Sequence, residues 1–435
     1  MGDRRLGVIG LGYAGLPLAL SFVEAGLEVV GVEADPQRVA DLQAGRSPVD
    51  GVSDDRVKAA IEAGFRVAGT NGADLAAVDA VLVCVPTPIN DAKEPDLGHV
   101  LSAGTLVATC LRPGQLVVLQ STTYPGTTNG PFREVLERSA LVAGRDFDLA
   151  YAPERVNPGD PASSSRDVPR LVAGVTQAGT DRTAALFHVV NTSVVELSSP
   201  DAAEMAKLFE NVFRNVNIAL VNELALLCER MGLDVWEIVD AAATKPFGFM
   251  RFVPGPGVGG HCIPVDPYYL AWRARQFGFA DRFVEVAGDI NLAMPDHVVE
   301  LVRQALNGRG RALKGARMGL IGVAFKPDVR DTRNSPAEAI FAQLAARGAR
   351  LAYHDPLVPT YRPAGGSTFA SQPLLKLIEG SDVIVVVTAH ALVDWDLVYS
   401  KAPLVVDAVG SSRGRSLRPR QVLRLGAGWA PGSIS

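Results

Sequence analysis

Short apolar segments alternate with helical segments along the first part of the chain, and this alternation restricts the fold more than any other feature. Residues 5–33 contain an apolar strand, "RLGVIGLG", a helical segment, "LPLALSFVEAG", and a second apolar strand, "LEVVGVE". Further apolar strands follow at "AVLVCVP" and "QLVVLQST", with helical stretches between them. Parallel strands are usually connected by helices, so the pattern predicts a parallel, doubly wound sheet.

A different pattern begins near residue 199, where "SSPDAAEMAKLFENVFRNVNIALVNELALLCERMG" is helical without interruption. Ser199 is suited to the N-cap, Pro200 to the first helical position, and Gly232 to the end of the helix. A helix of roughly 30 residues is ~45 Å long, which is enough to bridge two domains. Helical patterns continue to about residue 307.

A second alternating region then begins with the strand "RMGLIGVAF" and continues with "ARLAYHD", "DVIVVVTA" and "PLVVDAV". The chain is therefore expected to be an α/β protein with two Rossmann-like doubly wound domains, joined by a long central helix and a helical middle domain. The expected domain boundaries are 1–198, 199–308 and 309–435. The tail "GAGWAPGSIS" is expected to be loose.

Composition excludes several classes of protein. A chain of 435 residues is too long for one core, and its net charge of -5 argues against a surface that binds nucleic acid. The four cysteines form no CxxC pair, so neither disulfides nor a zinc site is expected, and a reducing compartment fits better. The chain has no signal-peptide pattern and no apolar stretch of ~20 residues. We expect a cytoplasmic protein without a membrane partner.

The segment "GLGYAG" places Gly10, Gly12 and Gly15 directly after a strand and at the start of a helix. This G-x-G-x-x-G spacing allows a tight turn, close approach of a pyrophosphate, and close helix–strand packing. Glu33 ends the second strand, where a carboxylate can accept both ribose hydroxyls of NAD. The alternatives are a solvated loop acid, or a phosphate of NADP held by the nearby Arg38. We expect NAD.

Seven segments occur in one order: "GVIGLGYAGLPLA", "VCVPTP", "STTYPGTT", "YAPERVNPG", "AKLFENVFRNVNIALVNE", "GPGVGGHCIPVDP" and "GVAFKPDVRDTRNSP". Together they resemble the nucleotide-sugar 6-dehydrogenases, the UDP-glucose and UDP-N-acetylhexosamine dehydrogenase family. The resemblance extends from Gly7 to about Asp407. It implies an NAD-binding domain at 1–198, a central dimerisation domain with a cysteine loop at 199–308, and a nucleotide-sugar-binding domain at 309–435. It also implies a homodimer.

The family's reaction is a four-electron oxidation of the sugar C6 hydroxymethyl to a uronic acid, and it explains a cysteine in the rigid segment "GPGVGGHCIPVDP". The aldehyde formed first is planar and cannot easily lose a second hydride. A thiolate that adds to it gives a thiohemiacetal, which can be oxidised to a thioester and then hydrolysed. The family's catalytic cysteine falls on Cys262, whereas Cys84 and Cys228 suit a buried structural role. The glycines of the segment are expected to let the backbone approach the sugar.

Further catalytic residues come from the resemblance. Lys207 and Asn211 are spaced i, i+4 on one helix face, and they match the family's oxyanion-stabilising lysine and its partner. Asp266 matches the aspartate that works with this lysine and a water molecule. Thr122 matches a threonine that places that water, and Glu154 matches the proposed general base of thioester hydrolysis.

The resemblance also assigns residues to the two ligands. The expected cofactor residues are Gly10, Gly12, Tyr13, Ala14, Gly15, Glu33, Arg38, Thr87, Thr122 and Arg333. The expected substrate residues are Glu154, Arg155, Val156, Lys207, Asn211, Arg251, Gly259 and Lys326, of which Arg251 would reach a neighbouring subunit's site.

One departure leaves the substrate open. Relatives carry a nucleotide-contacting arginine after the last strand, but "VVDAVGSSRG" has Val409 there, and Arg413 could replace it from a longer loop. UDP is the family's usual nucleotide and dTDP is the alternative, while the sugar is either an N-acetylhexosamine or glucose. Two other functions remain: a two-electron β-hydroxyacid-type dehydrogenase, which needs no Cys262, and a non-catalytic nucleotide-sugar-binding protein.

Overall fold

The computed structural model describes residues 3–70, 72–90, 92–155 and 166–430. The chain forms two compact units: a first unit of Met1–Asn211 and Val265–Ala280, and a second unit of Val212–Pro264 and Asp281–Ser435. The chain thus leaves the first unit, returns to it for one short segment, and leaves it again.

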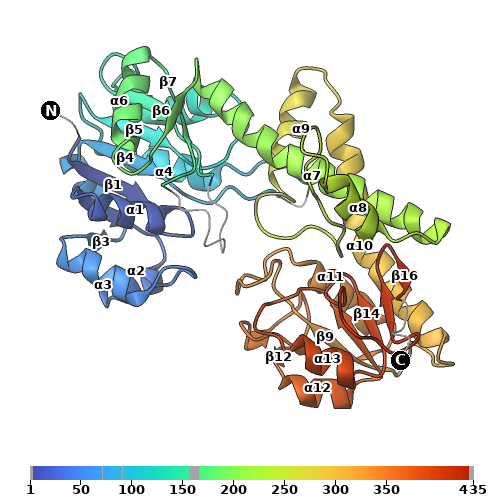
Figure 1. The fold of residues 1–435 in the computed structure, drawn as a ribbon. Helices are drawn as coiled ribbons and strands as arrows, with labels where there is room; N and C mark the ends of the chain where they lie inside the picture. The colour runs from blue at the N-terminus through green and yellow to red at the C-terminus, as the bar shows by residue number, and fades with distance from the viewer. Residues whose placement is uncertain (1–2, 71, 91, 156–165, 431–435) are drawn as a thin grey trace. The chain divides into compact units, whose positions relative to one another are not determined.

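The first unit is built on an eight-stranded sheet with the order β3-β2-β1-β4-β5-β6-β7-β8 (Figure 1). Its strands are β1 (Arg5–Ile9), β2 (Glu28–Val32), β3 (Arg66–Ala68), β4 (Ala80–Val83), β5 (Leu116–Leu119), β6 (Asp148–Tyr151), β7 (Arg170–Gly174) and β8 (Val194–Glu196). Strands β1 to β6 are parallel, and β7 pairs with β6 in the antiparallel direction. The order 3-2-1-4-5-6 is that of a dinucleotide-binding fold, in which ligands bind where the strand order reverses, between β1 and β4.

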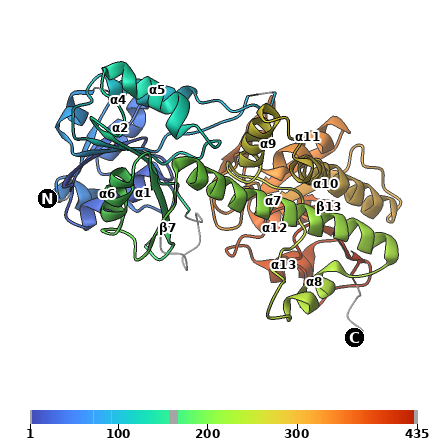
Figure 2. The same cartoon turned by 90° about the horizontal axis from the view of Figure 1, so that it is seen from above.

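Helices cover both faces of this sheet, as Figure 2 shows for α4 and α5 on one face and α1 and α6 on the other. The helices of the unit are α1 (Gly15–Glu24), α2 (Pro36–Gln43), α3 (Asp54–Glu62), α4 (Gly98–Ala108), α5 (Arg133–Leu136), α6 (Gln177–Phe187) and α9 (Asp266–Gln276). Because both faces are covered, the strands are nearly continuous apolar runs, and separate cores form on the two faces.

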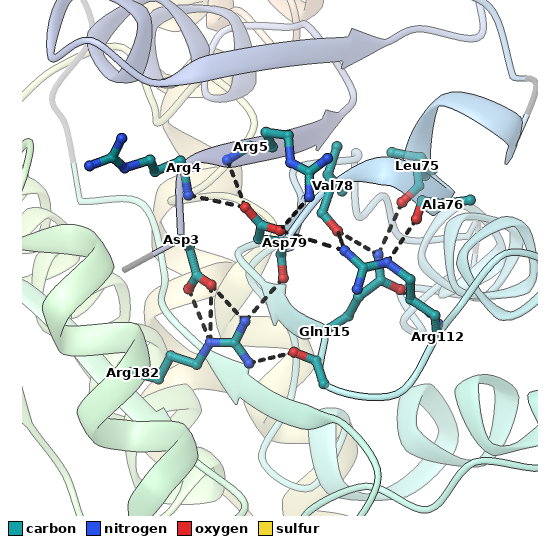
Figure 3. A network of polar contacts seen from close by, with 11 residues as sticks. Asp3, Arg4, Arg5, Leu75, Ala76, Val78, Asp79, Arg112, Gln115 and Arg182 are labelled. Atoms are coloured by element: carbon teal, nitrogen blue, oxygen red, sulfur yellow. Dashed lines mark hydrogen bonds and ion pairs between the residues drawn. The ribbon is translucent and has the colours of Figure 1, made fainter. Parts of the chain in front are cut away.

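A polar network ties together the amino ends of the strands, opposite the edge at which ligands bind (Figure 3). Asp79, just before β4, accepts hydrogen bonds from the backbone amide of Arg5 at 3.1 Å and from its guanidinium at 3.0 Å. Arg182 of α6 bonds to Asp3 at 2.6 Å and to Asp148 at 2.9 Å. These contacts join β1, β4 and β6 to a helix on the sheet face.

The second unit contains a six-stranded sheet with the order β10-β9-β13-β14-β15-β16. Its strands are β9 (Arg317–Ile321), β10 (Arg350–His354), β13 (Val383–Val386), β14 (Val405–Asp407), β15 (Val422–Arg424) and β16 (Gly428–Trp429), and β11 (Thr360–Tyr361) pairs separately with β12 (Phe369–Ala370). Its helices are α8 (Val235–Ala243), α10 (Arg282–Asn307), α11 (Pro336–Ala346), α12 (Leu374–Gly380) and α13 (Trp395–Lys401). Helix α11 covers one sheet face, and α12 and α13 cover the other (Figure 1).

The prediction that the tail "GAGWAPGSIS" is loose is wrong for part of its length. Residues Gly428–Trp429 form β16, which pairs with β15 in the antiparallel direction, and Ala430 is buried. The sequence does not predict this strand, because two residues, one of them glycine, carry no periodic pattern.

The long central helix is confirmed as α7 (Pro200–Met231), a single helix of 32 residues. The Ser199 hydroxyl accepts a hydrogen bond from the Ala202 amide at 3.2 Å, as an N-cap does. Gly232 follows the helix with a φ of 69°, a left-handed conformation that favours glycine. The expected fold class is also confirmed. Among the described residues, no helix has both the length and the apolar character that crossing a membrane requires.

Candidate active site

In the glycine-rich turn between β1 and α1, some glycines are needed for packing and one leaves open space. A Cβ atom at Gly15 would lie 1.8 Å from the carbonyl oxygen of Gly10, and Gly10 itself has a φ of 89°. Both glycines are therefore required by the packing of the turn. A Cβ atom at Gly12, in contrast, would meet nothing within 4 Å. The space beside Gly12 is open, as the approach of a pyrophosphate to the backbone requires.

The carboxylate at the end of β2 is held firmly beside this turn. Glu33 is buried, and it accepts hydrogen bonds from the amides of Leu11 at 3.0 Å, Ala34 at 2.8 Å and Asp35 at 3.1 Å. Its position is that of the acidic residue that binds the ribose hydroxyls of NAD. The Arg38 guanidinium lies 3.9 Å from the Asp35 carboxylate. The open turn and the fixed carboxylate together fit NAD.

Three other expected cofactor residues border this region. Tyr13 packs against the core on the α1 face, and Ala14 is the residue before α1. Thr87 follows β4, and its hydroxyl lies beside Tyr269 of α9, which donates a hydrogen bond to the Pro88 carbonyl at 2.9 Å.

A buried polar cluster lies between α7 and the start of α9. Lys207, Asn211 and Asp266 are all buried, and the Asn211 side-chain amide donates a 2.5 Å hydrogen bond to the Asp266 carboxylate. Burial raises the pKa of Asp266 to about 6, against the lowering effects of the Lys207 charge and the Asn211 hydrogen bond. A carboxyl group with this pKa can take up and release a proton near neutral pH.

The segment Thr122–Thr128, which follows β5, packs against both helices. Tyr124 lies in one apolar cluster with Leu208 of α7 and Tyr269 of α9. Arg273 of α9 donates a hydrogen bond to the Pro125 carbonyl at 2.9 Å. These contacts keep the segment that carries Thr122 in the same unit, and on the same two helices, as the buried polar cluster.

Glu154 follows β6 and is partly buried. Its carboxylate forms an ion pair of 3.1 Å with the buried Arg170 and accepts a hydrogen bond from the Arg155 amide at 2.8 Å. The Arg155 guanidinium lies 2.6 Å from the Glu210 carboxylate of α7. The expected substrate residue Val156 lies outside the described residues.

Cys262 belongs to the second unit, in an irregular segment that precedes α9 in the sequence. The segment is fixed by the loop after β9: the Gly260 amide donates to the Arg333 carbonyl at 3.1 Å, and the Asn334 side chain donates to the Gly260 carbonyl at 2.9 Å. A Cβ atom at Gly259 would lie 2.7 Å from the Phe325 side chain. In the described structure this glycine provides close contact with Phe325, a neighbour of Lys326.

The other cysteines differ from Cys262. Cys84 and Cys228 are buried, and burial raises the pKa of the Cys84 thiol to about 12, so it stays protonated. Cys110 is half-buried near the end of α4. All four cysteines lie in described residues, and none is part of a disulfide. Within those residues there is also no cluster of three or more His, Cys, Asp or Glu side chains that could hold a metal ion.

Several of the cations expected near the two ligands lie in the second unit. Lys326 is partly buried in the loop after β9, and the Arg333 guanidinium pairs with Asp331 at 2.5 Å. Arg251 pairs with Asp240 of α8 at 2.7 Å, and Arg413 contacts the same carboxylate. Val409 is partly buried against the core beneath α12 and α13.

The structure therefore divides the expected site residues between the two units. The first unit holds the expected cofactor residues up to Thr122, together with Glu154, Arg155, Lys207, Asn211 and Asp266. The second unit holds Arg251, Gly259, Cys262, Lys326 and Arg333.

Two buried charged residues were missed by the sequence analysis. Glu204 is fully buried in the N-terminal part of α7, and Arg170 pairs with Glu154. Glu204 did carry a signal, because it shares the helix face of Lys207 and Leu208, where an acid needs a partner. Arg170 carried no such signal in the sequence, because strand pairing in the folded sheet brings it to its partner Glu154.

Family models match most of the chain in three successive parts. Residues 4–191 match the NAD-binding domain of the UDP-glucose/GDP-mannose dehydrogenase family, residues 201–293 its central domain, and residues 319–411 its UDP-binding domain. With the fold and the cofactor turn, these matches define an NAD-dependent nucleotide-sugar dehydrogenase. The chain belongs to the UDP-glucose/GDP-mannose dehydrogenase family, and the expected family and cofactor are confirmed.

Individual relatives agree with this assignment. The chain is 37% identical to a UDP-N-acetyl-D-glucosamine 6-dehydrogenase of Pseudomonas aeruginosa, over 82% of this chain and 84% of the relative. It is 34% identical to a UDP-N-acetyl-D-mannosamine dehydrogenase of Pyrococcus horikoshii, over 91% and 92% of the two chains. The solved structure of the UDP-D-ManNAc dehydrogenase from Pyrococcus horikoshii is similar with a TM-score of 0.89 and 31% identity, over 98% of this chain and 100% of that one. A UDP-glucose dehydrogenase from Pyrobaculum islandicum gives a TM-score of 0.86 and 26% identity, over 98% of both chains.

Proposed function

We propose that this dehydrogenase oxidises C6 of a UDP-N-acetylhexosamine to the carboxylic acid, through an aldehyde and a thioester on Cys262. The observation that carries the proposal is the buried cluster of Lys207, Asn211 and Asp266, because a buried cation beside a carboxyl group with a pKa of about 6 suits alkoxide formation and proton transfer. The relatives named for UDP-N-acetylglucosamine and UDP-N-acetylmannosamine support the N-acetylhexosamine over glucose. The match to a UDP-binding domain supports UDP over dTDP.

Binding of the two ligands is assigned to separate sets of residues. Gly10, Gly12, Gly15 and Glu33 would hold NAD, which accepts a hydride in each of the two oxidations when it is bound. We assign residues 1–198 to cofactor binding, 199–308 to the central part and 309–435 to nucleotide-sugar binding. Lys326 of the last part would contact the substrate diphosphate.

In the first oxidation, the C6 hydroxyl loses its proton while the carbon loses a hydride. Lys207 stabilises the negative charge that develops on the oxygen. Asp266, held by Asn211, receives the proton through a water molecule, which Thr122 helps to place. The product of this step is the aldehyde.

In the second oxidation, the Cys262 sulfur adds to the aldehyde carbon, and the carbonyl oxygen becomes an alkoxide beside Lys207. Loss of a hydride from this carbon gives the thioester. Water then adds to the thioester with Glu154 as general base, the carbon–sulfur bond breaks, and the acid leaves while the thiol regains its proton. Arg170 pairs with the Glu154 carboxylate at 3.1 Å and so holds the proposed base in place.

Counting the NADH released per sugar tests this function against its alternatives. We expect two NADH per UDP-N-acetylglucosamine or UDP-N-acetylmannosamine, and slower turnover of UDP-glucose and dTDP-glucose. One NADH per sugar would indicate a simple two-electron dehydrogenase, and none would indicate a binding protein.

Replacing the nucleophile separates the two oxidations. In Cys262→Ser, acid production is expected to fall by at least about 10²-fold, because the second oxidation loses its covalent intermediate. The half-buried Cys110→Ser is the matched control and should retain full activity. Unchanged acid production by Cys262→Ser would refute the thioester route.

The central helix supports a homodimer, which we also propose. Large apolar side chains are exposed on one stripe of α7: Phe209, Phe213, Leu220, Leu227 and Met231. Their spacing of four and seven residues places them on one face of the helix. Contiguous exposed apolar surface of this kind is typical of an interface between protein chains.

A further inference from the structure

The N-terminal part of α7 contains a buried acid that none of the roles above uses. Glu204 is fully buried, three residues before Lys207. Ionised acids are seldom fully buried unless hydrogen bonds or cations compensate for the lost hydration. The partners of Glu204 therefore indicate why the chain keeps an acid at this position.

All of the hydrogen bonds described for Glu204 come from the segment that follows β5. One carboxylate oxygen accepts from the Thr128 amide at 2.8 Å, from the Thr128 hydroxyl at 2.6 Å and from the Thr123 hydroxyl at 3.4 Å. The other oxygen accepts from the Gly126 amide at 2.7 Å. One carboxylate thus holds both ends of Thr123–Thr128 against α7.

Two of these partners, the amides of Gly126 and Thr128, can only donate, and each faces a different oxygen of Glu204, so both oxygens must accept. Burial raises the pKa of Glu204 to about 7, while the hydrogen bonds from Thr128 and Gly126 act to lower it. An amide in place of the carboxylate would keep one accepting oxygen, but its NH₂ group would face another donor. The two accepting oxygens of Glu204 are therefore part of how the segment is held.

The held segment directly follows Thr122, the residue assigned to placing the reacting water. Its far side is held by α9, where Arg273 donates to the Pro125 carbonyl. Before Thr122, the Ser121 hydroxyl donates to the Val85 carbonyl at 2.7 Å. A change at Glu204 would release the α7 side of the segment while these other contacts remain.

We infer that Glu204 is a positioning residue of the dehydrogenase: it fixes the segment after β5 to the N-terminal part of α7, and so sets where Thr122 stands relative to Lys207. This inference rests on the proposed role of Thr122. Glu204 itself touches neither the substrate nor the reacting atoms.

A double-mutant cycle with the full-length enzyme tests the inference. In Glu204→Gln, kcat is expected to fall about 10–100-fold, because displacing a catalytic group by about 1 Å costs up to 10²-fold, while KM for NAD changes less than about twofold. In a Thr122→Ala background, the same change should cost less than about threefold, because the group being positioned is already gone.

The control and the possible outcomes separate this inference from the proposed function. Asp201→Asn removes an exposed acid from the same helix turn and should keep wild-type kcat. Full activity of Thr122→Ala would refute the role of Thr122 and the inference with it. If Thr122→Ala is impaired, then a wild-type kcat for Glu204→Gln, or losses that simply multiply in the double mutant, would overturn the inference alone.

A second variant covers the case in which Glu204→Gln does not fold. Thr128→Val removes one hydroxyl donor and leaves the carboxylate in place, so it should reduce kcat by a smaller factor and show the same coupling to Thr122→Ala. Thr128→Ser loses a methyl group but keeps the hydroxyl donor, and it should keep kcat near the wild-type value. Equal kcat values for Thr128→Val and Thr128→Ser would contradict the inference.

Discussion

The two glycines Gly12 and Gly15 look alike in the sequence, but they have different surroundings. Gly15 faces the Gly10 carbonyl so closely that no side chain fits, whereas the space beside Gly12 is open. Packing of the protein therefore requires Gly15, and approach of the cofactor requires Gly12. Substitution by alanine should separate these two requirements.

In Gly15→Ala, we expect the free energy of unfolding to fall by about 3 kcal/mol or more, because the new methyl group must displace backbone. Gly12→Ala is the matched variant, and its stability should change by less than about 1 kcal/mol while KM for NAD rises at least about tenfold. Thermal unfolding without ligand and NAD titration measure the two effects. Equal destabilisation by both substitutions would contradict this division of roles.

At the residue scale, the sequence predicts the glycine turn and Glu33 because their local chemistry is distinctive. It could not predict that Gly259 accommodates Phe325, since those residues are brought together only by the fold. The hydrogen bonds of Glu204 depend on tertiary structure in the same way. Residues whose role depends on a distant partner are therefore the ones that sequence patterns miss.

At the scale of elements, α7 was the most predictable part of the chain. Ser199, Pro200 and Gly232 mark its ends, and the 3.6-residue pattern between them is unbroken. Strand β16 and the pairing of β7 with β6 were not predictable, because short strands at a sheet edge have no sequence period of their own. A long helix is predictable because the helix propensities of many residues add up. A strand of two or three residues has too few residues for such a sum.

The exposed stripe of α7 makes a prediction about assembly. Leu220 and Leu227 are 61% and 50% exposed, and they lie two helical turns apart on one face. The double variant Leu220→Glu/Leu227→Glu should be monomeric at a concentration at which the wild type is a dimer, because two charges in an apolar interface are unfavourable. Light scattering after size-exclusion chromatography measures the mass.

A control keeps this prediction specific. Glu223 is an exposed residue of the same helix, and Glu223→Lys alters surface charge without adding a charge to the stripe. It should leave the mass unchanged. A dimer that persists in the double leucine variant would place the interface elsewhere.

At the scale of the whole molecule, the two units are expected to respond oppositely to pH. Burial raises the pKa of Asp266 to about 6 and of Glu204 to about 7, and both belong to the first unit. The stability that each contributes is fully present below the unfolded pKa of about 4 and is lost as pH rises through the folded pKa. In the second unit, arginines lower the pKa of Glu300 and of Asp382 to about 2, so their contribution is lost only as pH falls below about 4.

Between pH 5 and 8, the ligand-free first unit should therefore lose on the order of 1–3 kcal/mol of stability as pH rises. Thermal unfolding followed across this range should show the loss as a fall in Tm of about 2–4 °C per kcal/mol. The variant Glu204→Gln/Asp266→Asn should flatten the slope, while Glu300→Gln should leave it unchanged. A slope that survives the double substitution would show that other groups cause it.

The return of segment Val265–Ala280 to the first unit also affects how the protein is made. This segment supplies α9, with Asp266 and the side chains that cover the segment after β5. A ribosome that has finished residue 211 must add 53 more before it reaches Val265, which takes roughly 3–10 s at ~5–20 residues per second. During that interval Leu208 and Tyr124 have no α9 to cover them. The newly made chain therefore carries the glycine-rich turn before it can complete the buried polar cluster of Lys207, Asn211 and Asp266.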